Sequence, residues 1–307
     1  MIEEQIPRAL AGERLDRVVA LLAEVSRSVA ASLIEGGFVT VNGAPAAAGK
    51  TKVAEGASVC IDESGIEIAG PPEADPSVEF GVVYEDDDIV VIDKPAGLVV
   101  HPATGHQTGT LVNGLLARFP EIDGVGQDER PGIVHRLDVG TSGLLVVARS
   151  EVAYDELVDR LRDHDVERIY VALVWGHPKA AVGVVEAPIG RDPHEPLKMA
   201  VVADGREART RYRVERRYTG PELSLLRCEL ETGRTHQIRV HLAAIGHPVV
   251  ADSMYGPRRT FLGLERPFLH AAELSFDHPV SGERLRFTSP MPDDLTTMLA
   301  GLEPIEA

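Results

Sequence analysis

The sequence contains only two cysteines, Cys60 and Cys228. They lie far apart and form no CxxC pair, so the chain has neither the cysteine spacing of a disulfide framework nor that of a thiolate metal site. We therefore expect both cysteines to be ordinary reduced thiols.

Long hydrophobic runs are also missing. No apolar stretch approaches the roughly 20 residues that a helix needs to cross a bilayer. The first residues, Met1 to Glu4, are acidic, whereas a secretory signal begins with basic residues. These two features predict a cytoplasmic protein with no membrane partner.

Positive charge is scarce, because 31 lysines and arginines stand against 48 acidic residues, a formal net charge of −17. Such a charge repels polyphosphates, whereas nucleic-acid binders usually present a basic surface. The segment 206–217 is an exception with six arginines, and in an extended strand Arg209, Arg211 and Arg213 would share one face. Two interpretations stay open: this face follows a phosphate backbone, or it is a solvated face paired with neighbouring carboxylates.

Two breaks divide the chain. DESG at residues 62–65 and PPEADP at residues 71–76 end every regular pattern. A chain of 307 residues exceeds what one small core usually organises. We predict a small N-terminal domain over residues 1–64, a linker over residues 65–77 and a large domain over residues 78–307.

The N-terminal part predicts a helix pair followed by short strands. Residues 15–22 have helical apolar spacing, and Ser26 is the expected N-cap of a second helix. Residues 38–43 alternate into an Asn-Gly turn, the preferred signal of a two-residue hairpin, and residues 57–61 predict another short strand.

The most informative stretch is HRLDVGTSGLLVVAR at residues 135–149. Asp138 lies between an arginine-bearing segment and a glycine-rich turn, and the apolar run behind it predicts a buried strand. A reactive carboxylate at this place would have a rigid support. From spacing alone, an aspartate that only stabilises the turn is an equal alternative.

Spacing argues against two further chemistries. GAPAAAGKT at residues 43–51 has five residues between its glycines, where a phosphate-binding loop has four, and no helix is predicted after it. Residues 140–143 lack the GxSxG spacing of a serine hydrolase. We expect no nucleotide cofactor.

A metal-dependent hydrolase is the remaining alternative of this kind, because His236, His241, His247 and Asp252 are conceivable ligands. We expect residues 234–242 to form a strand, on which His236 and His241 face opposite sides. Neither an HExxH motif nor a cysteine cluster is present, so we predict no metal site.

The same predicted strand would separate its side chains into two sets. Arg239 would share one face with Gln237 and His241. The opposite face would carry Arg234, His236 and Ile238. One face would line a pocket, and the other would pack or contact RNA.

Four segments, in order, resemble the RluA/RluD family of RNA pseudouridine synthases: residues 85–102, 135–149, 168–170 and 231–242. The resemblance implies an α+β catalytic domain with a large mixed, mostly antiparallel sheet flanked by helices. It also implies isomerisation of uridine to pseudouridine in structured RNA. No cofactor is implied, because a carbon–nitrogen glycosidic bond is exchanged for a carbon–carbon bond without redox change.

Residues 13–61 resemble the S4 RNA-binding domain, above all in SRSVAASLIEGGFVTVNG. The second helix carries few of the cations often found there in that family, so modest RNA affinity is implied. The remaining cations of this module are Arg14, Arg17, Arg27, Lys50 and Lys52.

The resemblance assigns the catalytic roles. Asp138 would attack the ribose or remove its 2′ proton, and Arg239 would keep that carboxylate ionised and oriented. Tyr170 would stack on the base or transfer a proton, and Ile238 would form a pocket wall; both are alternatively core residues. Arg136 would occupy the gap when the uridine is flipped out. Arg136 and Arg234 alternatively only bind phosphate.

The implied RNA contacts are Arg136, Arg234, Ile238, His236, Arg209, Arg211, Arg27 and Lys50. The whole-chain pattern is most similar to the RluD branch, so ribosomal RNA in a pre-ribosomal large subunit is the expected partner. A tRNA target is the alternative within the family. A noncatalytic RNA-binding ribosome-assembly factor is the alternative from another class.

Overall fold

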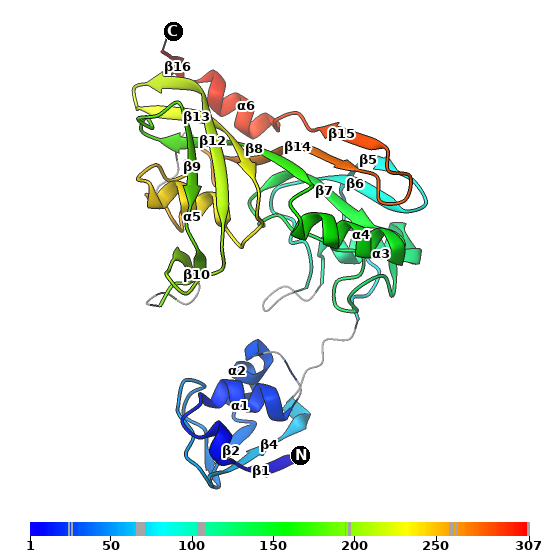
Figure 1. Ribbon diagram of the computed structural model, residues 1–307, viewed down its shortest axis with the longest axis vertical. Coiled ribbons are helices and arrows are strands. Elements are labelled where there is room, and N and C mark those ends of the chain that lie inside the picture. The colour runs from blue at the N-terminus through cyan, green and yellow to red at the C-terminus, as the bar shows by residue number, and fades with distance from the viewer. Residues whose placement is uncertain are drawn as a thin grey trace. The chain divides into compact units, whose positions relative to one another are not determined.

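The computed structural model describes residues 1–23, 25, 27–65, 71–102, 108–193, 195, 198–257, 261 and 263–305. The chain divides into two units, Met1–Gly70 and Pro71–Ala307 (Figure 1). Ser26, the predicted N-cap, and residues 66–70 of the predicted linker lie outside the described residues. No helix in the described part is long and apolar enough to cross a membrane.

The first unit packs two helices against a four-stranded antiparallel sheet with the order β1-β4-β2-β3. Its elements are β1 (Ile2–Gln5), the short η1 (Arg8–Leu10), α1 (Leu15–Leu22), α2 (Arg27–Glu35), β2 (Val39–Val41), β3 (Ala44–Pro45), β4 (Ser58–Ile61) and η2 (Glu63–Gly65). The predicted helix pair, hairpin and following strand are thus confirmed.

Local sequence explains these elements. In α1, Leu15, Val18 and Val19 are fully buried, because spacings of three and four residues place them on one helix face. Between β2 and β3, Asn42 and Gly43 have φ values of 53° and 79°. A two-residue hairpin turn needs these left-handed conformations, which asparagine and glycine tolerate best.

The second unit is built on a ten-stranded sheet with the order β16-β12-β13-β8-β14-β7-β6-β5, to which β15 adds beside β14 and β9 beside β12. Only the β14 and β7 pair is parallel, so the predicted mixed, mostly antiparallel sheet is confirmed. The strands are β5 (Gly81–Glu85), β6 (Ile89–Lys94), β7 (Ser142–Ala148), β8 (Glu167–Trp175), β9 (Val182–Glu186), β12 (Arg209–Thr219), β13 (Leu223–Leu230), β14 (Leu269–Asp277), β15 (Arg284–Thr288) and β16 (Glu303–Pro304).

Helices flank this sheet (Figure 1). They are α3 (Leu111–Arg118), the short η3 (Pro120–Ile122), α4 (Glu151–Arg162), α5 (Gln237–Ala244) and α6 (Asp293–Ala300). A separate two-stranded ribbon, β10 (Ile189–Arg191) with β11 (Met199–Val201), lies near α5.

Strand β7 is buried along its whole length, as its apolar run predicts. Leu145 and Val147 belong to the core cluster that includes Leu115 of α3, whereas Val146 belongs to the cluster that includes Leu157 of α4. Each such leucine or valine contributes about 1.5 to 3 kcal/mol through burial. The segment just before β7, which carries Asp138, therefore has a rigid support.

The predicted strand over residues 234–242 is wrong, because the chain forms helix α5 from Gln237. His236 adopts the left-handed conformation (φ 57°) and reverses the chain before the helix. The Gln237 amide accepts from the Arg234 backbone N–H and donates to the Arg209 carbonyl. These contacts to a distant strand fix the helix start, which the local alternation of apolar residues does not reveal.

Candidate active site

A tight turn presents Asp138 just before β7. The Asp138 backbone carbonyl accepts a 3.0 Å hydrogen bond from the Thr141 N–H, and the Val139 carbonyl accepts one of 2.7 Å from the Gly97 N–H. The Arg266 guanidinium donates to the Gly140 carbonyl. Because backbone groups close this turn, the Asp138 carboxylate is left to face a pocket of about 430 Å³.

Two carboxylates hold the Arg239 guanidinium, which extends from α5. Its Nη1 lies 3.1 Å from Asp138 Oδ2, and its Nε and Nη2 lie 2.7 and 3.0 Å from the two oxygens of Asp252. Burial disfavours the charge, but the hydrogen bonds and charges of Asp252 and then Asp138 outweigh it and raise the pKa of Arg239. The guanidinium is thus permanently charged and aimed at Asp138.

Asp252 itself is fully buried and serves as an anchor. Its Oδ1 also accepts hydrogen bonds from the backbone N–H groups of Met254 and Tyr255. The Tyr255 ring lies 5.0 Å from the centre of the Arg239 guanidinium, within cation–π range. Asp252 and Tyr255 therefore compensate the charge of Arg239 without the help of Asp138.

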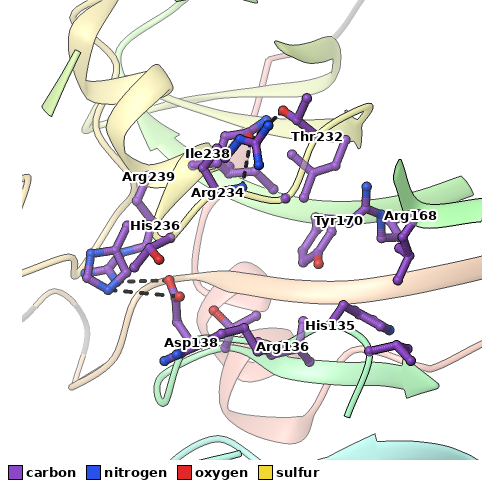
Figure 2. Close-up of a pocket in the computed structure, with 18 of the residues that line it drawn as sticks. His135, Arg136, Asp138, Arg168, Tyr170, Thr232, Arg234, His236, Ile238 and Arg239 are labelled. Carbon is purple, nitrogen blue, oxygen red and sulfur yellow. Dashed lines mark hydrogen bonds and ion pairs between the residues drawn. The ribbon is translucent and has the colours of Figure 1, made fainter. Parts of the chain in front are cut away.

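His236 lies beside Arg239, on the same side of Asp138 (Figure 2). Its Nε2 lies 4.0 Å from Asp138 Oδ1, and its Nδ1 shares a 2.7 Å hydrogen bond with the Tyr255 hydroxyl. Burial lowers the pKa of His236, although the Asp138 charge opposes this effect. The imidazole is therefore neutral near pH 7.

Tyr170 and Ile238 line the same pocket and are both part of the hydrophobic core. The alternatives of core residue and pocket wall therefore do not exclude each other. Burial raises the pKa of Tyr170 to about 12, with the Arg168 charge opposing and the Asp138 charge adding to the effect. The phenol stays protonated under neutral conditions.

Among the residues that the structure describes, six arginines and a single carboxylate, that of Asp138, line the pocket. Arg136 is exposed, with its Nη1 3.4 Å from His101 Nε2, and Arg234 donates to the Glu207 backbone carbonyl. Neither forms an ion pair with a carboxylate of the described chain. The acidic protein thus keeps unneutralised positive charge around Asp138.

Arg209 and Arg211 lie outside this pocket, on the predicted strand β12. Both bind the Glu231 carboxylate, with Arg209 Nη1 at 3.0 Å, and Arg209 Nε also lies 3.6 Å from Glu186. The strand is as predicted, and the carboxylate pairing of Arg209 and Arg211 agrees with the second of the two interpretations left open by the sequence.

In the first unit, Arg27 and Arg14 both bind the buried Asp16, at 3.0 and 2.6 Å. Lys50 is exposed, in the turn before Thr51. Both predicted RNA contacts are exposed, and Arg27 in addition forms an ion pair.

The metal-ligand set considered from the sequence is dispersed by helix α5. His241 contacts Thr210 and the Ala187 carbonyl, and His247 contacts the Trp175 carbonyl. Within the described chain, a different group, Asp86, Asp88 and His278, brings three possible ligand atoms close together. Asp86 there already accepts hydrogen bonds from Tyr84 and from two backbone N–H groups.

Sequence reasoning missed three residues of the pocket region. From the sequence, Asp252 is only a conceivable metal ligand, Arg168 is part of a family segment without a role of its own, and Tyr255 has no role. The local signal is weak: Asp252 follows the apolar residues 249–251 and stands three residues before Tyr255. This pattern does not reveal that the carboxylate is buried beside a cation.

Comparison with known proteins adds independent evidence. Residues 88–244 match the family model described as RNA pseudouridylate synthase, and residues 13–59 match that of the S4 domain. An uncharacterized RNA pseudouridine synthase of Chloroflexus aurantiacus is 49% identical, over 97% of this chain and 92% of that protein. The ribosomal large subunit pseudouridine synthase D of Nitrosomonas europaea is 45% identical, over 98% and 88%.

A solved structure shares the fold of the second unit. Human RNA pseudouridylate synthase domain containing 1 superposes with a TM-score of 0.58 at 28% identity. The match covers 74% of this chain and 89% of the human one.

Proposed function

This chain belongs to the RNA pseudouridylate synthase family, and we propose that it converts specific uridines of large-subunit ribosomal RNA to pseudouridine with Asp138 as the catalytic carboxylate. The isomerase activity follows from membership of the family. The RNA target is supported by the Nitrosomonas europaea relative, whose name specifies the large ribosomal subunit. A pre-ribosomal large subunit in the cytoplasm is the corresponding partner, and tRNA is the alternative target.

The observation that carries the residue assignment is the ion pair of Asp138 with Arg239 inside the pocket. The reaction detaches uracil from C1′ of the ribose, turns the base and rejoins it through C5. Asp138 would attack C1′ or remove the 2′ proton to give a glycal. Both routes need an oriented carboxylate, and Arg239 orients Asp138 without depending on it for its own position.

Tyr170 and Arg136 complete the proposed reaction site. The uridine has to leave its stack, because the reacting atoms of a paired base are inaccessible. Arg136 would fill the gap that the flipped base leaves. Tyr170, which stays protonated, would stack on the base or transfer a proton, and Ile238 would form the adjacent wall.

Several groups would bind the RNA around the flipped uridine. Arg234 and His236 would contact it at the pocket. Arg209 and Arg211 would contact phosphates outside the pocket, where the phosphates compete with Glu231 for these arginines. Arg27 and Lys50 would contribute from the S4-like domain. We assign residues 1–64 to that domain, residues 65–77 to the linker and residues 78–307 to the catalytic domain.

The test is pseudouridine formation on protein-free large-subunit rRNA fragments and on tRNA. Wild type would be compared with Asp138→Asn, which keeps the side-chain volume but removes the charge. Asp204→Asn is the matched control, because it removes an exposed carboxylate that does not line the pocket. We expect product on rRNA with wild type and Asp204→Asn, and none with Asp138→Asn.

Product on tRNA alone would replace the proposed target. Full activity of Asp138→Asn would overturn the assignment of the carboxylate. No product from a folded wild-type protein that still binds both RNAs would favour the noncatalytic assembly factor.

A further inference from the structure

Arg168 is a second buried arginine of the pocket, and its surroundings differ from those of Arg239. It lies on β8 and is only 6% exposed. Its Nη2 donates to the Glu231 backbone carbonyl at 3.2 Å, and its buried Nε has no hydrogen-bond partner. Within the described part of the chain, Arg168 forms no ion pair with a carboxylate.

An uncompensated buried charge is costly, so its retention calls for an explanation. Burial lowers the pKa of Arg168, and the nearby Arg234 charge adds to this effect, but an arginine remains protonated in proteins. Of its neighbours, His135 is neutral, because burial lowers its pKa to about 3, and Tyr170 is neutral as well. The pocket therefore holds a cation that no anion among the described residues neutralises.

The position of this cation is defined by Tyr170. Arg168 and Tyr170 share one face of β8, being two residues apart. In Figure 2, Tyr170 lies between Arg168 and Asp138, and the charges of both act on its phenol. Gly233 covers the guanidinium so closely that a Cβ there would lie 2.7 Å from Arg168 Nη1. The pocket thus has a negative end at Asp138 and a positive end at Arg168.

We propose that Arg168 is a further catalytic residue, whose guanidinium donates to a uracil oxygen and stabilises the anion that the base becomes on leaving the ribose. When the bond between C1′ and N1 breaks, its electron pair goes to the base, and the negative charge spreads over N1 and the two carbonyl oxygens. A fixed cation at this place stabilises that charge where it develops. The charge on the base is neutralised when C5 bonds to C1′, as the bond from C1′ to Asp138 breaks or the 2′ proton returns to the glycal. C5 then loses its proton and N1 takes one up, so the number of protons does not change.

This inference rests on the proposed function but not on the role of Asp138. Whether Asp138 attacks C1′ or removes the 2′ proton, the base departs with the same electron pair. Arg168 would therefore act in both routes. With the ribose at Asp138, a base stacked on Tyr170 would extend toward Arg168.

The experiment compares Arg168→Met and Arg168→Lys with wild type under single-turnover conditions. Methionine has a similar length without the charge, whereas lysine keeps the charge. Arg284→Met is the matched control, because that arginine is exposed on β15, away from the pocket. The RNA dissociation constant and the thermal unfolding of each variant would be measured in parallel.

Two substrates are needed, RNA with uridine and RNA with 5-fluorouridine at the mapped site. Fluorine withdraws electrons and stabilises the base anion, so cleavage should depend less on Arg168. The readout is disappearance of the starting nucleoside after digestion of the RNA. For uridine, we expect Arg168→Met to lower the single-turnover rate by about 100-fold or more. We expect a clearly smaller loss for 5-fluorouridine, an intermediate loss for Arg168→Lys, and unchanged RNA affinity.

Equal losses on the two substrates would overturn the inference, as would a loss confined to the dissociation constant, which would instead make Arg168 a phosphate contact. If Arg168→Met fails to fold, Arg168→Lys takes its place. The rate loss of that variant on uridine RNA is then compared with its loss on 5-fluorouridine RNA. Absence of product from wild type would overturn the proposed function and this inference with it. If wild type forms product and the Arg168 variants lose the same factor of rate on uridine and on 5-fluorouridine RNA, only the inference about Arg168 would be overturned.

Discussion

Two groups of arginines in the catalytic unit differ in what neutralises them. On β12, Arg209 and Arg211 share the Glu231 carboxylate. At the pocket, Arg136 and Arg234 contact only a histidine or a backbone carbonyl. Arg209 and Arg211, which belong to the denser arginine cluster of the sequence, are thus partly neutralised, whereas no ion pair of the described residues neutralises Arg136 or Arg234.

This difference explains how a chain with a net charge of −17 offers an RNA site. A carboxylate next to a cation cancels most of the cation's field at distances larger than their separation, whereas an unpaired cation acts over the Debye length, about 8 to 10 Å at ordinary salt. Arginines without such a partner keep their attraction for phosphate. The pocket has one carboxylate among its lining residues, so it remains positive. The distribution of acids matters as much as that of arginines.

The largest effect is expected for Arg239, a buried pocket arginine that two carboxylates bind. Arg239→Met should lower single-turnover pseudouridine formation by about 100-fold or more, because Asp138 loses its orienting charge. It should also destabilise the fold by about 3 to 5 kcal/mol, since Asp252 would be a buried, unpaired carboxylate. Chemical denaturation measures the second effect.

The double variant Arg239→Met with Asp252→Asn separates the two consequences. It should recover much of the stability without recovering the rate. Wild-type turnover in Arg239→Met would contradict the pairing of Arg239 with Asp138 as a functional contact.

Arg136 should show a smaller effect that depends on the substrate. If it fills the gap left by the flipped base, Arg136→Ala should slow modification of a paired uridine more than that of the same uridine in an open loop. The measurement is the single-turnover rate on two RNAs that differ only in pairing at the target. An identical loss on both RNAs would reduce Arg136 to a phosphate contact.

Salt dependence compares the two arginine groups directly. The pair Arg136→Gln and Arg234→Gln should lower the slope of log affinity against log salt by about 2, one for each phosphate that the protein no longer neutralises. The pair Arg209→Gln and Arg211→Gln should lower it by less, because Glu231 competes with phosphate. Both double variants remove two positive charges, so each controls for net charge. Equal salt slopes for the two double variants would show that the pocket arginines and the β12 arginines contribute alike to RNA binding.

The smallest effect should come from Glu231→Gln, and with the opposite sign. Removing this carboxylate frees Arg209 and Arg211, so RNA affinity should rise and its salt slope should steepen. Stability should change by only about 0 to 1 kcal/mol, as for other partly exposed ion pairs. Unchanged RNA binding would remove the β12 face from the interface.

The sequence predicts those parts of the structure that local contacts determine. The hairpin at Asn42 and Gly43 and the buried strand behind Asp138 follow from residues close in the chain. Helix α5 does not, because its start depends on hydrogen bonds from Gln237 to Arg209 and Thr210 on a distant strand. The alternating apolar pattern of that segment favours a strand until those partners are in place.

In the candidate site, too, some features follow from the local sequence and others depend on distant residues. The family motifs identify Asp138, Tyr170 and Arg239, whereas the partners that control their charges come from elsewhere in the fold. Asp252 carries no local sign that it binds Arg239, and Glu231 none that it neutralises two arginines of another strand. Electrostatic pairing across strands is a property of the folded sheet.

The contact between Asp138 and Arg239 joins residues 101 positions apart. During synthesis, Asp138 emerges from the ribosome long before Arg239, and Asp252 follows later still. A partly made chain therefore carries the carboxylate without the guanidinium that orients it. With the proposed pair as the catalytic centre, competence would arise only when the second half of the sheet has assembled, and RNA modification would then report the completed folding of the catalytic unit.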